Sequence, residues 1–114
     1  MARTTLTKTD LPGAYAGDGE TLTFEAADVT DMNDFVFTGG EIVIARNTDG
    51  GAAHDVTLSS ADDPFGRRED IEDSVPADAV RVYGPFKRRG WLQSDGRFHL
   101  EADDAAIEFA VLAP

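Results

Sequence analysis

The 114-residue chain contains no cysteine, so disulfide bonds, thiolate metal sites and thiol nucleophiles are all excluded. It has no apolar run near the roughly 20 residues that would span a bilayer, and its first residues lack the apolar centre of a signal peptide. A chain of this length forms one domain with a modest core and little room for a deep cleft. We therefore expect a soluble, non-secreted domain without a membrane contact, held together by packing or by subunit contacts.

Positive charge is also scarce: 10 Lys and Arg face 22 Asp and Glu, which gives a net charge of -12. This charge repels phosphates, so we expect no direct binding to nucleic acid. Asp outnumbers Glu and Arg outnumbers Lys. A surface rich in Asp and poor in Lys is similar to that of halophilic proteins, because high salt screens self-repulsion. An acidic mesophilic protein with high-GC codon usage is the alternative.

A helical pattern is largely missing, and apolar residues instead recur at every second position, as in strands with one buried face. The pattern predicts about eight short strands, over residues 22–26, 35–38, 41–47, 54–60, 80–83, 90–93, 98–100 and 107–111. Glycine-rich turns separate them, and Asp95-Gly96 predicts a hairpin between the Trp91 and Phe98 strands. The sequence therefore predicts an all-β fold: an antiparallel β-sandwich or small barrel, jelly-roll-like.

Two segments lack this alternation. Residues 62–78 are highly charged and predict an exposed excursion, with one helical turn possible at 70–74. Residues 1–19 predict an extended N-terminal arm that precedes a β domain over 20–114. The Thr-rich start of the arm would suit addition to the sheet edge of another subunit, and a frayed terminus is the alternative. The arm residues expected to contact a partner are Arg3, Thr4, Leu6, Leu11 and Tyr15.

Catalytic signatures are weak. On a strand, His99 shares a face with Glu101 and could pair with it, whereas His54 and Asp55 point to opposite faces. Serine lies in no Gly-x-Ser-x-Gly context, and the Gly-Gly pairs precede predicted strands rather than helices. We therefore expect no enzyme activity and no cofactor.

Metal binding has slightly more support. Asp28, Asp31 and Asp34 lie close in sequence and are weak candidates for binding a hard cation such as calcium or magnesium. Such clusters also arise by chance in a chain so rich in Asp.

Half of the basic residues lie in two similar segments, Pro-Phe-Gly-Arg-Arg at 64–68 and Pro-Phe-Lys-Arg-Arg at 85–89. Glu69 and Asp70 follow the first segment and could neutralise it locally. The second has no carboxylate before Asp95 and is flanked by aromatic residues that, if exposed, are typical of protein interfaces. The candidate contact residues in these segments are Phe65, Arg67, Arg68, Phe86, Lys87, Arg88, Arg89 and Trp91.

Fragments along nearly the whole chain resemble small proteins encoded among the head genes of tailed phages and haloarchaeal tailed viruses. The fragments are Met-Ala-Arg-Thr-Thr-Leu-Thr at 1–7, Phe-Thr-Gly-Gly-Glu at 37–41, Ala-Arg-Asn at 45–47, Asp-Pro-Phe-Gly-Arg at 63–67, Tyr-Gly-Pro-Phe at 83–86, Gly-Trp at 90–91, Leu-Glu-Ala at 100–102 and Phe-Ala-Val at 109–111. They are turns and strand fragments rather than catalytic signatures.

The resemblance implies a structural role in the virion. Capsid decoration proteins are similar in plan, with a compact β domain, usually trimeric, and an N-terminal arm laid over the major capsid protein. It thus implies the major capsid protein and sister subunits as partners. The implied location is the capsid surface, after passage through the host cytoplasm. A head-completion or tail-tube component and a glycan-binding surface module are the alternatives.

Overall fold

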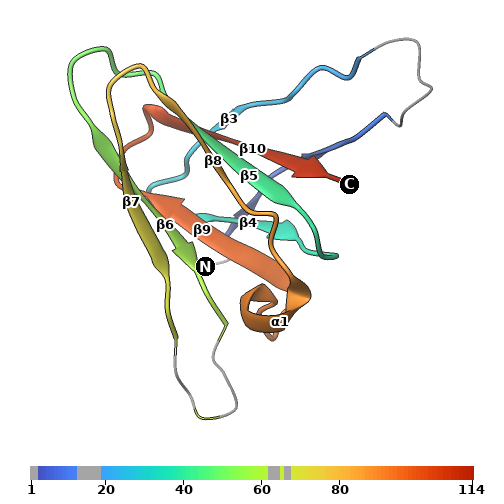
Figure 1. The fold of residues 1–114 in the computed structure, drawn as a ribbon. Coiled ribbons are helices and arrows are strands. Elements are labelled where there is room, and N and C mark those ends of the chain that lie inside the picture. The colour runs from blue at the N-terminus through green and yellow to red at the C-terminus, as the bar shows by residue number, and fades with distance from the viewer. Residues whose placement is uncertain (1–2, 13–18, 62–64, 66–67) are drawn as a thin grey trace.

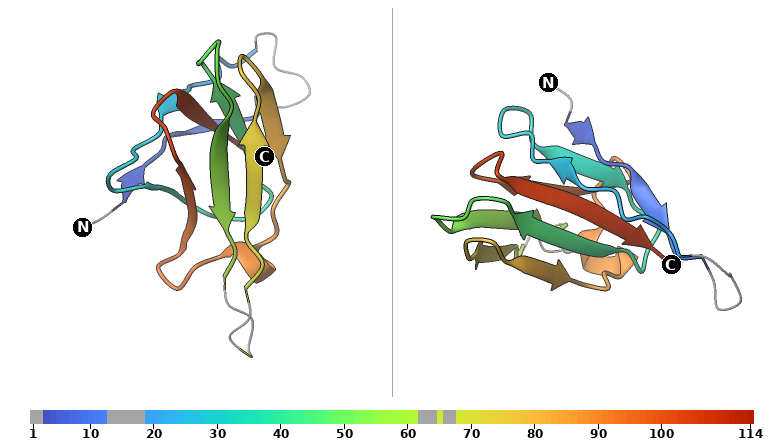
Figure 2. Two further views of the ribbon diagram at one scale, coloured as in Figure 1. Left: turned by 90° about the vertical axis from the view of Figure 1, so that its left-hand side faces the viewer. Right: turned by 90° about the horizontal axis from the view of Figure 1, so that it is seen from above.

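The computed structural model describes residues 3–12, 19–61, 65 and 68–114, and these form two packed β-sheets. Sheet A has the strand order β1-β4-β9-β6-β7, and sheet B the order β2-β10-β5-β8, with β3 also paired to β10. Figures 1 and 2 show the sheets as two layers. The predicted all-β sandwich is confirmed, although the described residues form ten strands and the sheets are mixed rather than purely antiparallel.

The strand bounds are as follows. Sheet A contains β1 (Thr4–Thr5), β4 (Asn33–Val36), β9 (Arg97–Ala102), β6 (His54–Ser59) and β7 (Ile71–Val75). Sheet B contains β2 (Lys8–Asp10), β3 (Glu25–Ala26), β10 (Ile107–Ala113), β5 (Ile42–Asn47) and β8 (Val80–Tyr83). The only helical segment in the described residues is α1 (Arg88–Trp91).

The core lies between the sheets because alternate residues of the inner strands are apolar. In β5, Val43 and Ala45 are fully buried, whereas Ile42 and Ile44 face outward and are only partly covered. The largest buried side chains are those of Phe35, Phe98, Phe109, Leu58, Leu100 and Ile107. The two-residue period that predicted these strands therefore also identified most of the core.

The described part of the predicted N-terminal arm belongs to the sandwich, so the expectation of a separate arm is wrong for residues 3–12. Strand β1 pairs in parallel with β4, and β2 pairs in parallel with β10. Between them Leu6 points into the core and is only 4% exposed. The β-propensity of this segment is thus satisfied by the molecule's own sheets, and burial of Leu6 stabilises the pairing.

The other candidate contact residues of the predicted arm have different environments. Arg3 donates hydrogen bonds from Nη1 to the carbonyl oxygens of Asn33 and Leu100, at 3.2 and 3.3 Å. Thr4 is exposed on β1, and Leu11 is half exposed just beyond β2. Tyr15 lies outside the described residues.

Two other predictions are wrong. Residues 71–75, predicted to lie in an exposed excursion, form β7, which pairs with β6 along its whole length. Residues 90–93 are predicted to be a strand, but residues 90–91 end the short helical segment α1 and residues 92–93 follow it without strand structure, so the predicted hairpin with β9 does not form. Gly90 has a φ of 96°, which a strand does not allow.

In the described residues, no helix has the length and apolar character needed to cross a membrane.

Candidate interaction surface

The second basic segment forms an exposed turn, here called the basic turn (residues 87–91), at the end of the sandwich where β9 begins (Figure 1). The chain reaches it from β8 through Gly84, which has a φ of 107°, and a cis bond to Pro85. A Cβ atom on Gly84 would lie 3.0 Å from the carbonyl oxygen of Glu41, so this close approach requires glycine.

Two backbone hydrogen bonds then hold Phe86 against the neighbouring turn formed by residues 39–41. The Phe86 N–H donates to the Glu41 carbonyl at 3.1 Å, and the Gly40 N–H donates to the Phe86 carbonyl at 2.7 Å.

Aromatic packing anchors the basic turn to the core. The Phe86 ring is 4% exposed and lies 4.8 Å from the ring centres of both Trp91 and Phe98. Trp91 is partly buried and stacks on Phe98, at 5.6 Å and 15°. The expectation of two exposed contact aromatics is therefore wrong for Phe86, because its ring fills the end of the core.

The other side of the turn is held by hydrogen bonds. The Ala61 N–H donates to the Gly90 carbonyl at 2.8 Å, and the Leu92 N–H donates to the Arg88 carbonyl at 2.9 Å. Gln93 Nε2 donates to the carbonyls of Ser59 and Ser60, at 3.2 and 3.0 Å. With both ends fixed, the backbone of the turn is held in one conformation.

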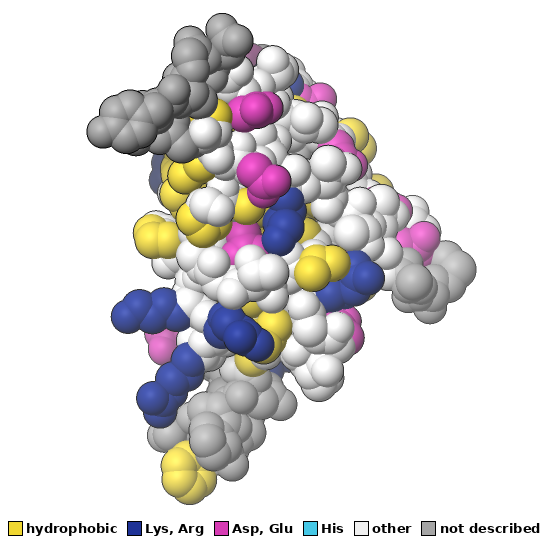
Figure 3. Space-filling view, turned by 90° about the vertical axis from the view of Figure 1, so that its right-hand side faces the viewer, with side chains coloured by type: hydrophobic (Ala, Val, Ile, Leu, Met, Phe, Trp, Pro, Cys, Tyr) yellow, Lys and Arg dark blue, Asp and Glu magenta, His cyan; other side chains and the backbone are white. Residues whose placement is uncertain are grey.

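The three cations of the basic turn carry uncompensated charge. Lys87, Arg88 and Arg89 are exposed, and none makes an ion pair or side-chain hydrogen bond with a described residue. Five other described cations pair with carboxylates: Lys8 with Glu41, Arg46 with Glu108, Arg68 with Asp70, Arg81 with Asp73 and Arg97 with Asp34. Figure 3 shows Lys and Arg side chains gathered in the lower half of one face of the molecule.

Arg68, a described residue of the first basic segment, lies at the same end. Arg68 lines a shallow hollow together with Gly90 and Trp91 of the basic turn. Its Nη2 atom lies 3.2 Å from Asp70 Oδ1, so Asp70 pairs with Arg68, one of the possibilities left open by the sequence. Phe65 is 82% exposed, as a contact residue would be, and Arg67 lies outside the described residues.

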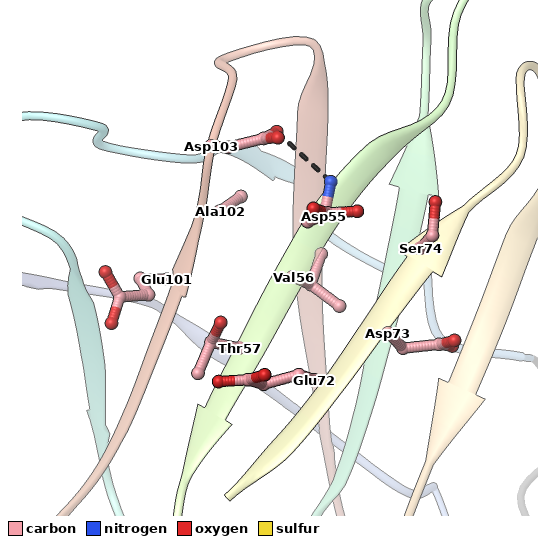
Figure 4. A pocket seen from close by; sticks show the side chains of 9 residues that line it. All are labelled: Asp55, Val56, Thr57, Glu72, Asp73, Ser74, Glu101, Ala102 and Asp103. Atoms are coloured by element: carbon pink, nitrogen blue, oxygen red, sulfur yellow. Dashed lines mark hydrogen bonds between the residues drawn. The ribbon is translucent and has the colours of Figure 1, made fainter.

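Towards the other end of β9, an open hollow on the outer face of sheet A is lined by acidic and hydroxyl side chains of β6, β7 and the end of β9 (Figure 4). Its polar lining consists of Asp55, Thr57, Glu72, Asp73, Ser74, Glu101 and Asp103. The Asp55 N–H donates to Asp103 Oδ1 at 3.1 Å, which fixes the rim. The molecule thus has a cationic end and an anionic hollow.

The histidines do not form the pairs considered from sequence. His99 Nε2 lies 2.8 Å from Asp95 Oδ2, although His99 and Glu101 both lie on the outer face of β9. His54 Nε2 lies 3.0 Å from Asp49 Oδ2, and its Nδ1 lies 3.5 Å from Asp103 Oδ1. The carboxylates that contact the two histidines therefore come from residues in turns and not from neighbouring residues on the same strand.

The weak metal candidates are not brought together. Asp28 Oδ1 accepts hydrogen bonds from the N–H groups of Thr30 and Asp31, both at 3.0 Å, so it caps its own turn. These backbone bonds and one from the Thr4 hydroxyl hold the pKa of the Asp28 carboxyl below its ordinary value. Asp34 lies instead near Asp95 and His99 on sheet A.

No protein-family model matches the chain, and no curated protein or solved structure shows a significant similarity to it.

Proposed function

We propose that the protein is a structural protein of a tailed virion, a capsid decoration protein that docks on an acidic surface of the major capsid protein through its basic turn. The observation that carries the docking proposal is the set of three adjacent, unpaired cations on a rigid turn of a strongly acidic molecule. The resemblance of the chain to head-gene proteins supports the virion assignment.

The turn has properties that favour docking. Its backbone is fixed before contact, so little conformational freedom is lost on binding. Arg88 and Arg89 can each form two parallel hydrogen bonds with a carboxylate, and no described carboxylate competes for them. The acidic remainder of the molecule repels an acidic partner, so the cationic end is directed toward that partner.

A symmetric oligomer would strengthen such docking. In a homotrimer, three basic turns would engage the capsid together, and modest individual contacts would add to a stable attachment. Leu6 is buried and the segment around it is paired within the sheets, so the basic turn and not residues 3–12 is the proposed contact.

The test is binding to purified capsids that lack the protein. A variant with Lys87→Gln, Arg88→Gln and Arg89→Gln should bind at least about tenfold more weakly, with unchanged circular dichroism. The matched control adds the same negative charge at exposed positions away from the turn, with Thr21→Glu, Ala53→Glu and Ala105→Glu. Normal binding by the turn variant, or an equal loss in the control, would contradict the proposal.

Copy number distinguishes decoration from the alternatives. A decoration protein occupies sites across the capsid lattice, whereas a head-completion or tail-tube component forms a ring at one vertex or along the tail. Quantitative mass spectrometry of virions separates these outcomes. Glycan binding has less support, because the residues that line the acidic hollow include no aromatic side chain.

A further inference from the structure

Two strands and a turn bring a histidine and two carboxylates together on the outer face of sheet A. Asp34 of β4 lies directly opposite His99 of β9 in the antiparallel register. Asp95 lies in the turn that precedes β9 and contacts His99 through Oδ2, at 2.8 Å from Nε2. One ligand-type atom from each residue lies within 4.8 Å of the other two.

In each carboxylate, one oxygen accepts hydrogen bonds from neighbouring donors that do not belong to the group. Asp34 Oδ1 accepts hydrogen bonds from Thr5 Oγ1 at 2.8 Å and from Arg97 Nη1 at 3.3 Å. No described residue donates a hydrogen bond to Asp34 Oδ2, although this side chain is only 8% exposed. Asp95 Oδ1 accepts the Arg97 N–H at 3.0 Å, which leaves Oδ2 toward His99. Hydrogen bonds of this kind orient the ligands of protein metal sites.

From this geometry we propose that Asp34, Asp95 and His99 bind a divalent transition metal ion of the Zn²⁺ or Co²⁺ class. Zinc bonds to nitrogen and oxygen are about 2.0–2.2 Å long, so neighbouring ligand atoms on one ion lie roughly 3–3.5 Å apart. The ligand-type atoms lie within 4.8 Å of one another, so shifts of roughly 1–2 Å would bring them to that spacing. A donor set with imidazole suits these metals, whereas calcium and magnesium prefer oxygen ligands alone.

The charge of the site also favours a cation. Two carboxylates face one guanidinium, Arg97, whose Nη1 is already engaged with Asp34 and Thr5. The ion would replace the proton shared by the His99 and Asp95 contact, and solvent would complete its coordination because Asp95 is exposed.

The other histidine provides a matched control. His54 also contacts two carboxylates, but Asp49 lies at Nε2 and Asp103 at Nδ1. These nitrogens lie on different sides of the ring, so the two carboxylates and one ring nitrogen cannot share an ion. A metal should therefore distinguish His99 from His54.

The experiment titrates the full chain, freed of metal by a chelator, with Zn²⁺ by calorimetry and with Co²⁺ by visible absorption. We expect saturable binding of one ion, with NMR shifts of the His99 ring and not of the His54 ring. His99→Gln and Asp95→Asn should weaken binding by about tenfold or more, whereas His54→Gln should leave it unchanged.

Three results would overturn the proposal: no saturable binding by the wild-type chain, equal binding by His99→Gln, or an equal loss in His54→Gln. Circular dichroism checks the fold of each variant. If a variant fails to fold, the ring shifts of the wild-type protein alone decide between the two histidines. Capsid attachment through the basic turn is measured separately, so either proposal can fail without the other.

Discussion

Lys8 Nζ lies 3.1 Å from Oε2 of Glu41, a carboxylate that is completely buried. The Thr38 and Gly39 N–H groups also donate to this carboxylate, at 2.9 and 2.7 Å. Glu41 thereby joins β2 to the 39–41 turn, and its carbonyl receives the Phe86 N–H that positions the basic turn. One buried acidic residue therefore links the N-terminal segment to the candidate interaction surface.

Replacing Glu41 by Gln should destabilise the protein by about 3 kcal/mol, because the buried hydrogen bonds to a charged oxygen are lost. Chemical denaturation measures the change. Glu108→Gln is the matched control: its pair with Arg46 is partly exposed, so the loss should stay below about 1 kcal/mol. Equal losses in the two variants would contradict this role for Glu41.

Acid should weaken the same link. Burial alone would raise the pKa of Glu41, but hydrogen bonds from Thr38, Lys8 and Gly39 outweigh it and lower the pKa below 4.5. The stabilisation is therefore present above pH 4.5 and is lost as pH falls through the folded-state pKa. The melting temperature of wild type should drop more steeply in this range than that of Glu41→Gln.

His54 should contribute to the folding stability of the protein at neutral pH and below, and this contribution should be lost as pH rises. Its hydrogen bond with Asp49, together with the charges of Asp104 and Asp103, raises its pKa above 6.5 against the opposing effect of burial. Protonated His54 therefore stabilises the folded state. This stabilisation is fully present below pH 6.5 and is lost as pH rises through the pKa of His54 in the folded state. Melting temperatures between about pH 6 and 8.5 should fall less in His54→Gln than in wild type; an unchanged slope would refute the assignment.

The aromatic anchor of the basic turn can be followed through Trp91, the single tryptophan of the chain. Phe86→Ala should cost about 3–5 kcal/mol and shift Trp91 emission to longer wavelength, because the indole loses its buried neighbour. Val82→Ala removes an exposed side chain and should change neither property appreciably. Unchanged emission in Phe86→Ala would show that the turn is held by other contacts.

Tyr83 spans the two sheets, since its hydroxyl donates to Asp73 Oδ2 of β7 at 2.8 Å. Burial, followed by the hydrogen bond and the charge of Asp73, raises the pKa of Tyr83 well above its ordinary value of 10. In a Tyr15→Phe variant, the one remaining tyrosine should therefore resist ionisation at pH 10–11 when absorption at 295 nm is followed, and should ionise together with alkaline unfolding. The Asp73→Asn substitution should lower the pH at which half of the Tyr83 side chains are ionised.

Alternation predicted β5, β6, β9 and β10 closely, because each has one buried face. It also predicted β8, but Val80 and Val82, the apolar residues that predicted this strand, are exposed rather than buried. It missed β7, whose central residue, Asp73, is a partly buried carboxylate rather than an apolar side chain. Tyr83 and Arg81 reach this carboxylate from the other sheet, which makes its partial burial possible. Such a long-range partner leaves no local pattern, so the segment had the appearance of a charged loop.

The candidate surface was only partly predictable. The clustering of Lys87, Arg88 and Arg89 is visible in the sequence, but their lack of partners depends on where the folded chain places its carboxylates. Burial of Phe86 likewise depends on Trp91 and Phe98 packing at the same end of the core. The group of Asp34 with His99 was missed because strands distant in sequence bring them together.

The last strand, β10, lies inside sheet B and pairs with β2, β3 and β5. During synthesis, β2 therefore cannot pair with β10 until residues 107–113 have left the ribosome. Sheet B cannot be completed before residues 107–113 have been synthesised, and folding dominated by such distant pairings is slow. Nascent chains stalled before residue 107 should consequently depend on chaperones and be degraded readily by proteases.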